Sequence, residues 1–148
     1  RLHHVKPHGA LYNLAATSPE TAHAIASAVL ALDPQCRLIG LSGSCLIDAA
    51  RAAGLRAVQE VFADRNYLSD GSLVPRNQPH ALFQDPQEIA SRSASIVETG
   101  VVIAIDGTPL TLQCDTLCVH SDTPNAVAIA VSIRREFSER SIRIQAAD

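Results

Sequence analysis

The sequence predicts an α/β protein with a mainly parallel sheet and helices packed outside it. Strand-like and helix-like segments alternate almost throughout the 148 residues, which is typical of parallel sheets. Short polar clusters also follow several of the apolar segments that we expect to be strands. Because α/β sheets carry their sites at the carboxyl ends of strands, these clusters indicate one polar site at one edge of the sheet.

The first half of the chain is predicted to alternate strictly between strand and helix. Ser18 can cap a helix and Pro19 suits its first turn, and apolar residues then recur at helical spacing until Asp33. Gly54 is typical of the end of the next helix. The expected elements, in order, are a strand at residues 2–5, a helix at 18–33, a strand at 37–41, a helix at 46–53 and a strand at 56–62.

The second half begins with a long polar loop, residues 63–80, which exceeds the usual length of a connection and is typical of a functional or mobile segment. Asp85 and Glu88 form a capping-box pattern, and Gly100 ends the helix that follows. The elements expected after the loop are a helix at 85–98, strands at 101–105, 110–113 and 116–119, a helix at 123–139 and a strand at 142–144. The segment at 110–113 is expected to return along 101–105 as a local hairpin.

The composition indicates one domain, residues 1–148, with an aliphatic core. The chain is 47% hydrophobic and 18% charged, and it has only three Phe, two Tyr and no Trp. The net charge of -3 and the lack of a basic run argue against nucleic acid as a partner. No apolar stretch reaches the roughly 20 residues of a membrane helix. The chain lacks Met and opens in a strand-like segment, so we expect it to be part of a longer polypeptide.

Four cysteines occur, and none of them forms a C-x-x-C pair. Cys114 and Cys118 would lie about 13 Å apart on a strand, too far to share one ion or to form a disulfide. We therefore expect inert thiols in a reducing compartment, the cytoplasm.

Lys6 and His8 form the first polar cluster, in the sequence Lys6-Pro7-His8-Gly9. Lys6 offers a cation for a carboxylate or phosphate, and His8 can relay a proton or bind a metal. A capped loop with a surface histidine is the alternative.

Glu60 and Asp64 form the second cluster. Glu60 lies in an otherwise apolar strand, where a carboxylate needs a partner, and Arg65 and Lys6 are the candidates. Asp64 is then a general base or a metal ligand. The alternative is a structural ion pair that supports the loop.

The remaining clusters are Arg76 and the pair His120 and Asp122. Arg76 can clamp an anion, although a solvated arginine explains it nearly as well. His120 and Asp122 face one side of an extended chain just before a helix amino terminus, which favours anions. Alternatively, Asp122 or Thr123 is only a helix cap and His120 a bystander.

The main geometric prediction is that Lys6, His8, Asp64, His120 and Asp122 converge at one rim of the sheet. Four of them, His8, Asp64, His120 and Asp122, could hold a divalent ion, and the sequence does not rank metal binding above proton transfer. The phosphate-loop pattern G-x-x-x-x-G-K-[ST] does not occur.

Three segments resemble a known family, the LamB/YcsF family, in order and length. These segments are Val5-Lys6-Pro7-His8-Gly9-Ala10-Leu11-Tyr12-Asn13, the region from Glu60-Val61-Phe62-Ala63-Asp64-Arg65 to Val74-Pro75-Arg76, and Cys118-Val119-His120-Ser121-Asp122-Thr123-Pro124-Asn125-Ala126. The resemblance spans essentially the whole chain and covers the carboxyl-terminal part, a little over half, of a typical member.

The resemblance implies part of a distorted (β/α) barrel similar to the carbohydrate-deacetylase barrels. It further implies ATP-dependent opening of 5-oxo-L-proline to L-glutamate, as the A subunit of a 5-oxoprolinase whose partners are subunits B and C. A divalent cation is an optional further cofactor. On this reading the catalytic residues are Lys6, His8, Asp64, His120 and Asp122, and the residues that bind substrate or phosphate are Asn13, Glu60, Arg65 and Arg76.

Two other classes of function stay open at this point. One keeps the barrel and makes it a metal-dependent amide hydrolase or deacetylase. The other is not enzymatic, and makes the chain a segment whose open sheet edges bind a partner.

Overall fold

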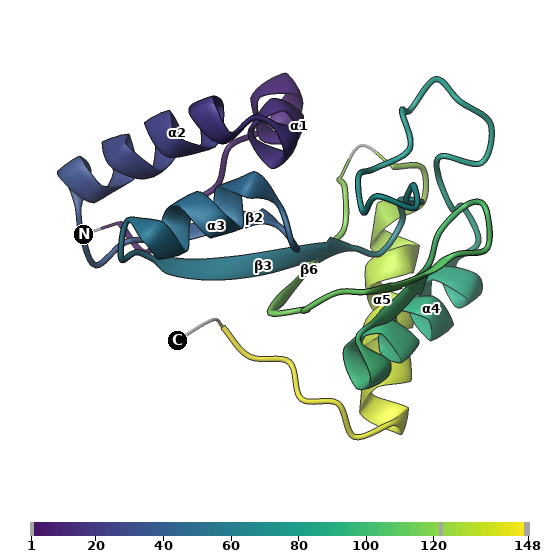
Figure 1. The fold of residues 1–148 in the computed structure, drawn as a ribbon. Coiled ribbons are helices and arrows are strands. Elements are labelled where there is room, and N and C mark those ends of the chain that lie inside the picture. The colour runs from purple at the N-terminus through teal and green to yellow at the C-terminus, as the bar shows by residue number, and fades with distance from the viewer. Residues whose placement is uncertain (1, 122, 147–148) are drawn as a thin grey trace. The chain divides into compact units, whose positions relative to one another are not determined.

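A computed structural model describes residues 2–121 and 123–146 (Figure 1). The chain divides into two compact units, with the boundary between Glu60 and Val61. Strand β3, Arg56–Phe62, runs through this boundary. The first unit therefore ends within a strand, and the second unit begins with the last two residues of that strand.

The first unit contains a short parallel sheet. Its strands are β1 at His4–Val5, β2 at Arg37–Leu41 and the first part of β3. β2 pairs in parallel with β1 and with β3, and Leu41 lies opposite Glu60. The predicted parallel arrangement of these strands is therefore confirmed.

Three helices pack with one another in the first unit, and two of them also contact β2. They are α1 at Gly9–Thr17, α2 at Pro19–Leu32 and α3 at Cys45–Ala52. The Oγ atom of Ser18 accepts the N–H of Thr21 at 3.2 Å, so the predicted cap of α2 is confirmed. The core of this unit consists of small aliphatic side chains and one cysteine: Ala15, Ala22, Ala26, Val29, Cys36, Leu38, Leu46, Ala50 and Leu55.

Helix α1 was not predicted from the sequence. Of its nine residues only Tyr12 and Ala15 are buried, whereas Leu11 and Leu14 are about half exposed. The apolar residues of this segment therefore do not trace one buried stripe, and the periodic signal that marks a helix is weak.

In the second unit, the long loop follows the end of β3, and backbone hydrogen bonds hold its segments together. Isolated antiparallel bridges join Arg65 to Leu82 and Tyr67 to Leu73. Within the loop, Asp70 accepts the N–H of Ser72 at 2.8 Å, and Gly71 has a φ of 83°, so Asp70-Gly71 forms a tight turn, as these two residue types favour.

After the loop, two helices form the framework of the second unit. α4 spans Pro86–Thr99 and α5 spans Ala126–Glu139, and they pack side by side (Figure 1). Asp85 caps α4 through the N–H of Gln87, and Gly100 ends it with a φ of 68°, both as predicted. The core between the helices contains Ala63, Ile89, Ala90, Ala94, Ile129, Ile133 and Phe137.

The strands of the second unit are short. β4 at Val101–Ile103 and β5 at Pro109–Thr111 form the predicted antiparallel hairpin. β6 at Thr116–Cys118 lies next to the end of β3, since the N–H of Ala63 donates to the carbonyl of Cys118 at 3.0 Å. This pairing brings the segment after β6 close to the segment after β3.

The predicted start of the last helix at residue 123 is wrong. α5 begins at Ala126, because Asn125 adopts a left-handed conformation with a φ of 63° and interrupts the helical path. The hydroxyl of Thr123 is instead bonded to Asp64. Thr123 is therefore not the cap of α5, contrary to one of the alternatives considered above.

The predicted strand at 142–144 is also wrong. Ser141 has a φ of 58°, and the N–H of Ile142 donates to the carbonyl of Phe137 at 2.7 Å. This bond closes the carboxyl end of α5 in a Schellman motif, and Ile142 packs against the core of the second unit. The apolar residue that suggested a strand therefore serves as the end of a helix.

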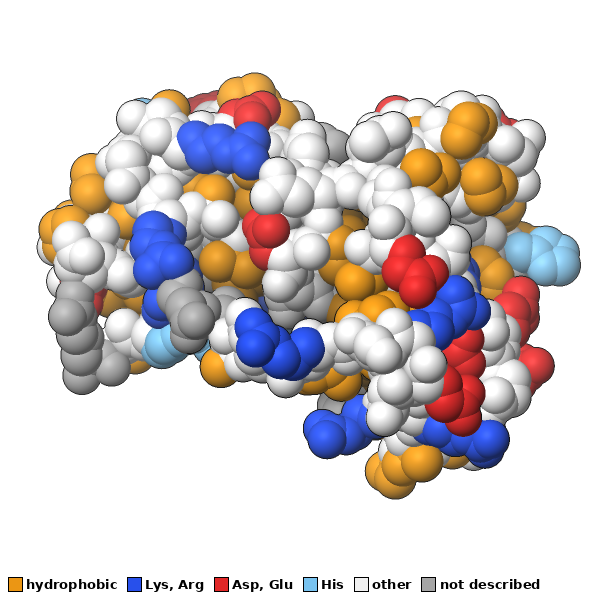
Figure 2. Space-filling view, turned by 90° about the horizontal axis from the view of Figure 1, so that it is seen from below, with side chains coloured by type: hydrophobic (Ala, Val, Ile, Leu, Met, Phe, Trp, Pro, Cys, Tyr) orange, Lys and Arg blue, Asp and Glu red, His pale blue; other side chains and the backbone are white. Residues whose placement is uncertain are grey.

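Surface charges of both signs are interspersed. On the face displayed in Figure 2, basic and acidic side chains alternate with apolar ones, which agrees with a net charge of only -3. Among the helices of the described residues, none combines the length and the apolarity needed to cross a bilayer.

Candidate functional site

In the first unit, a lysine and a tyrosine share the carboxylate of Glu60. Lys6 follows β1, Tyr12 lies in α1 and Glu60 lies near the carboxyl end of β3. Nζ of Lys6 donates to Oε1 of Glu60 at 2.6 Å, and the hydroxyl of Tyr12 donates to Oε2 at 2.9 Å. The side chains of Glu60 and Lys6 are only 5% and 18% exposed. We call this group the Glu60 cluster.

The Glu60 cluster explains how an apolar strand contains a buried carboxylate. Both carboxylate oxygens have a donor, and one donor carries the opposite charge, so the desolvation of Glu60 is offset. Nζ of Lys6 also lies 5.6 Å from the centre of the Tyr12 ring, within cation–π range. The geometry thus selects Lys6, of the two candidates, as the ion-pair partner of Glu60, and it favours the structural alternative for this pair.

His8 and Asn13 also belong to the first unit, and both are exposed. His8 is the residue before α1; its backbone is extended and its side chain makes no capping hydrogen bond. Asn13 lies within α1, on the turn after His8. The roles predicted for His8, Asn13, Lys6 and Glu60 in catalysis or in binding stay predictions.

In the second unit, two side chains from the segment after β6 meet the carboxylate of Asp64. Nδ1 of His120 lies 2.9 Å from Oδ1 and 3.1 Å from Oδ2 of Asp64, and the hydroxyl of Thr123 donates to Oδ2 at 2.7 Å. Asp64 is fully buried, whereas the His120 side chain is 19% exposed. We call this group the Asp64 triad. It joins the loop after β3 to the loop after β6.

The Asp64 triad keeps the carboxyl group ionised. Burial alone would raise the pKa of Asp64, but the hydrogen bonds from His120 and Thr123, together with the charge of His120, outweigh burial and lower it below its ordinary value. An ionised carboxylate has no proton to donate, so Nδ1 of His120 must carry the hydrogen of the shared bond. In the neutral ring, Nε2 is then the nitrogen that can accept a proton.

The ring of His120 is held on a second side by Phe62. The two rings stack with centroids 5.2 Å apart and planes 17° apart. Stacking fixes the plane of the imidazole, and the carboxylate of Asp64 fixes its rotation. A base with this orientation can abstract a proton from a water or a substrate placed at Nε2.

Arg65 and Arg76 lie in the long loop of the second unit. Nη2 of Arg65 donates to the carbonyl of Val74 at 2.7 Å, so this guanidinium holds the loop rather than pairing with Glu60. Burial and the nearby charge of Arg76 lower the pKa of Arg65. Arg76 itself is exposed. The prediction that Arg65 and Arg76 bind an anion stays a prediction.

The structure thus brings Lys6 to Glu60 in one unit and Asp64 to His120 in the other. Asp122 lies outside the described residues. The convergence of Lys6, His8, Asp64, His120 and Asp122 at one site therefore stays a prediction.

Metal binding is likewise a prediction. Over residues 2–121 and 123–146, no three His, Cys, Asp or Glu side chains gather in a way that would hold an ion. Asp64 and His120 would be two of the predicted ligands.

Three residues that support the Asp64 triad or the Glu60 cluster were not predicted from the sequence. Tyr12 and Phe62 lie within the family segments, and a buried aromatic residue next to a polar cluster is a weak signal for such a contact. Arg92 carries no sequence signal at all, because a single arginine in an amphipathic helix is typical of a surface residue. Its Nη1 donates to the carbonyls of Phe62 and Ala63 at 3.0 and 2.9 Å.

Comparison with known proteins places the chain in one group of sequences. The model of the LamB/YcsF family matches residues 1–148. Proteins named as the A subunit of 5-oxoprolinase are similar: the one from Heliobacterium modesticaldum is 47% identical over 146 residues and the one from Bordetella parapertussis 52% identical over 147, in both cases over 99% of this chain.

A solved structure has the same fold. The lactam utilization protein from Thermus thermophilus is 44% identical in sequence and superimposes with a TM-score of 0.90 over 99% of this chain. The predicted class, a mainly parallel α/β sheet that forms part of a distorted barrel, is thereby confirmed. The chain spans 58% of the length of these two relatives and of the solved structure.

Proposed function

This chain belongs to the LamB/YcsF family, and we propose that it acts within the A subunit of a 5-oxoprolinase, which opens 5-oxo-L-proline to L-glutamate. Support comes from the names of its relatives, which refer to 5-oxoprolinase or to the use of lactams. The substrate 5-oxo-L-proline is itself a lactam. The word subunit in those names implies partner chains, and we propose that these are subunits B and C.

The observation that carries the proposal is the Asp64 triad. Nε2 of His120 takes a proton from the water that attacks the lactam carbonyl carbon. The ionised Asp64 stabilises the imidazolium that forms and keeps its Nδ1–H in place. His120 then returns the proton to the ring nitrogen as the carbon–nitrogen bond breaks. The products of these steps are a carboxylate and an amine, which are the two groups that distinguish L-glutamate from its lactam.

ATP dependence is part of the proposal, although two groups of the first unit that could contact a phosphate already have protein partners. Lys6 is the residue type that commonly binds a phosphate, but its Nζ is bonded to Glu60. The N–H of Gly43, in the glycine-containing loop before α3, donates to Oε1 of Gln59 at 3.1 Å and is turned to the protein. ATP dependence therefore rests on the family alone, as does a requirement for a divalent cation.

The test is the conversion of 5-oxo-L-proline by the full-length protein together with subunits B and C. We expect release of L-glutamate that requires ATP, and we expect none from the lactam when one of the three proteins is omitted. Turnover that needs no ATP and is abolished by a chelator would replace this proposal with a metal-dependent amide hydrolase. Full activity of the other two proteins without this one would leave it a non-catalytic partner. We place the assembly in the cytoplasm, where ATP is available.

A further inference from the structure

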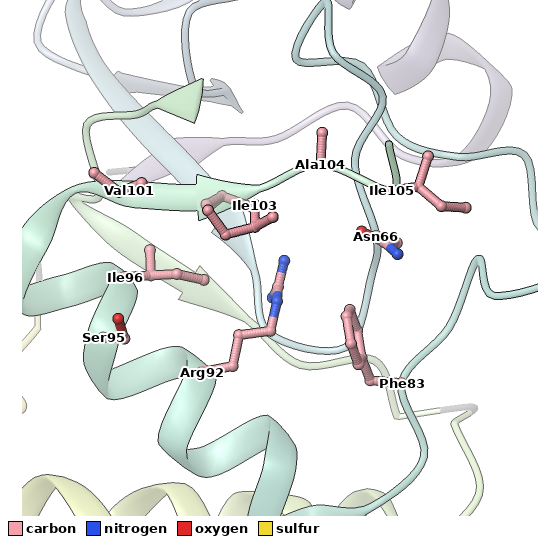
Figure 3. A pocket seen from close by; sticks show the side chains of 10 residues that line it. Asn66, Phe83, Arg92, Ser95, Ile96, Val101, Ile103, Ala104 and Ile105 are labelled. Atoms are coloured by element: carbon pink, nitrogen blue, oxygen red, sulfur yellow. The ribbon is translucent and has the colours of Figure 1, made fainter. Parts of the chain in front are cut away.

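The second unit contains a cavity that none of the steps above uses. Its volume is about 380 Å³, and it lies between α4, the β4 strand and the start of the long loop. Most of its wall is apolar and comes from Phe83, Ile96, Val102 and Ile103. Arg92 and Asn66 are the groups in this wall that offer hydrogen-bond donors from long polar side chains. Figure 3 shows the guanidinium of Arg92 directed into the space between Ile103, Asn66 and Phe83.

Arg92 is an unusual wall residue because its charge is only partly compensated. Nη1 is used by the carbonyls of Phe62 and Ala63, while Nη2 is buried and has no hydrogen-bond partner among the described residues. The guanidinium carbon lies 4.7 Å from the centre of the Phe83 ring. Carbonyl dipoles and an aromatic face stabilise a cation, but because they are neutral they do not cancel the positive charge of the guanidinium.

No carboxylate lies within ion-pair distance of Arg92 in the part of the chain that the structure describes. Asp64 and Glu88 act on it only through longer-range attraction, and burial lowers the pKa of the guanidinium. Asp64 is also already engaged by His120 and Thr123. Arg92 is only partly buried as a residue, but its Nη2 atom is buried, and an unbonded buried N–H is unfavourable. The cavity thus has a positive wall that lacks its anion.

We propose that this cavity binds a small monocarboxylate with a compact apolar body, and that Arg92 receives its carboxylate. The apolar walls fit a short ring or branched chain, and the volume accommodates a molecule of that size. The proposal stands apart from the 5-oxoprolinase assignment. The substrate 5-oxo-L-proline is a small cyclic monocarboxylate and is one candidate occupant, whereas L-glutamate, which has two carboxylates and an open chain, is not.

Asn66 supplies a second polar contact. Its Oδ1 accepts the N–H of Tyr67 at 3.0 Å and its Nδ2 donates to the carbonyl of His80 at 3.3 Å, so the amide is held with one hydrogen left over. Ile103 and Ile105, which line the cavity, are 56% and 41% exposed. Because Nη2 of Arg92 is buried, the proposal requires side chains of this wall to move when a carboxylate binds.

The test is a titration of the isotopically labelled protein followed by the backbone and Arg92 side-chain resonances. The probes are 5-oxo-L-proline, cyclopentanecarboxylate, 2-pyrrolidinone and inorganic phosphate. We expect saturable shifts at Arg92, Asn66 and Ile103 with the two carboxylates. Binding of 2-pyrrolidinone should be at least about tenfold weaker because it lacks the charge-assisted contact to Nη2, and binding of phosphate should be as weak because phosphate has no apolar body to fill the cavity. Tighter binding of 5-oxo-L-proline would identify the reaction substrate as the occupant; equal binding would identify a general carboxylate site.

Two variants separate ligand binding from folding. Arg92→Gln removes the charge, but it also weakens the bonds to Phe62 and Ala63. Ile103→Asp leaves those bonds intact and places a negative charge, the same sign as that of the ligand, on an exposed residue of the cavity wall. We therefore expect about tenfold or greater loss of carboxylate binding with an unchanged melting curve. Val127→Asp is the matched control: it puts the same charge on a residue that is 80% exposed on α5, and binding should not change.

Equal affinity for the carboxylates and for 2-pyrrolidinone would overturn the proposal, as would unchanged carboxylate binding in Ile103→Asp. Neither result bears on the 5-oxoprolinase reaction, which the glutamate assay tests by itself. Loss of carboxylate binding in Val127→Asp as well would also count against the site, because the effect would then be one of net charge.

Discussion

Nδ1 of His120 lies 2.9 Å from Oδ1 of Asp64, although the two residues are 56 positions apart in the chain. The contact forms because β6 runs beside the end of β3, with Ala63 bonded to Cys118. The hydroxyl of Thr123 and the ring of Phe62 then fix the carboxylate and the imidazole. Both groups are oriented before any substrate binds, which is the arrangement that acid–base catalysis requires.

Replacement of the two central residues should remove activity without unfolding the protein. We expect His120→Ala and Asp64→Asn to lower kcat for glutamate release in the assembled enzyme by about 10²–10⁴-fold, the usual contribution of a positioned acid–base group. Rates are measured with subunits B and C present, and folding is checked by circular dichroism.

The matched control for these variants is His23→Asn, which changes an exposed histidine on α2. It should retain the kcat of the parent enzyme. Near-parental turnover in His120→Ala would remove this histidine from the mechanism, whatever its contact with Asp64.

The lowered pKa of Asp64 makes stability depend on pH in the acid range. The unfolded carboxyl has an ordinary pKa, so below about pH 4 the unfolded chain takes up a proton that the folded protein excludes. The free energy of unfolding therefore falls as the pH drops through this range, until the pH passes the folded pKa. Above the pKa of the unfolded carboxyl, the stabilisation is fully present.

Thr123→Val tests this dependence. The substitution removes one of the hydrogen bonds that lower the pKa of Asp64. We expect a loss of about 1–2 kcal/mol at neutral pH and a shallower further loss in acid, measured by urea unfolding at several pH values. Thr111→Val, at an exposed position of β5, should show the same dependence of unfolding free energy on pH as the parent protein. If the unfolding free energies of the parent and of Thr123→Val changed with pH in parallel, the hydrogen bond from Thr123 would not be a cause of the lowered pKa of Asp64.

The Glu60 cluster should contribute strongly to the stability of the first unit. Glu60→Gln leaves the mostly buried ammonium of Lys6 without its opposite charge, and we expect the free energy of unfolding to fall by about 2–4 kcal/mol. Urea denaturation measures the change. Asp48→Asn makes the same chemical change at a residue of α3 outside this cluster and should have little effect.

A double variant distinguishes the ion pair from the shape of the side chain. Adding Lys6→Met to Glu60→Gln removes the unpaired charge, so the double variant should recover part of the loss. Additive losses would show that Lys6 and Glu60 stabilise the unit independently of each other.

Gly100 should resist replacement for two separate reasons. Its φ of 68° is left-handed, and a Cβ at this position would lie 3.1 Å from the carbonyl oxygen of Leu112. Gly54 follows α3 with a φ of 75°, but a Cβ there would meet nothing within 4 Å. We expect Gly54→Ala to destabilise the protein by about 1 kcal/mol and Gly100→Ala by clearly more, in thermal or urea unfolding. Equal losses would mean that Leu112 moves aside.

Local signals in the sequence were sufficient for most elements. Ser18 and Asp85 cap helices through bonds to residues two or three positions ahead, and Gly100 permits the turn that ends α4. Such contacts depend on neighbours in the chain, so composition and spacing can predict them. The same logic failed at 142–144, where Ile142 is apolar because it closes a helix end against the core rather than because it lies in a sheet.

Most of the strands and helices, the aliphatic core and the polar ends of the strands follow from the sequence by itself, because propensity, periodicity and caps act over a few residues. Helix α1 and the helix end at Ile142 do not. Only the tertiary structure decided three contacts. Glu60 pairs with Lys6, Thr123 bonds to Asp64 instead of capping α5, and Arg92 reaches the carbonyls of Phe62 and Ala63. These contacts join residues about 30 to 60 positions apart. Strand pairing and helix packing set their geometry, and no local pattern in the chain encodes which distant group will arrive at a given side chain.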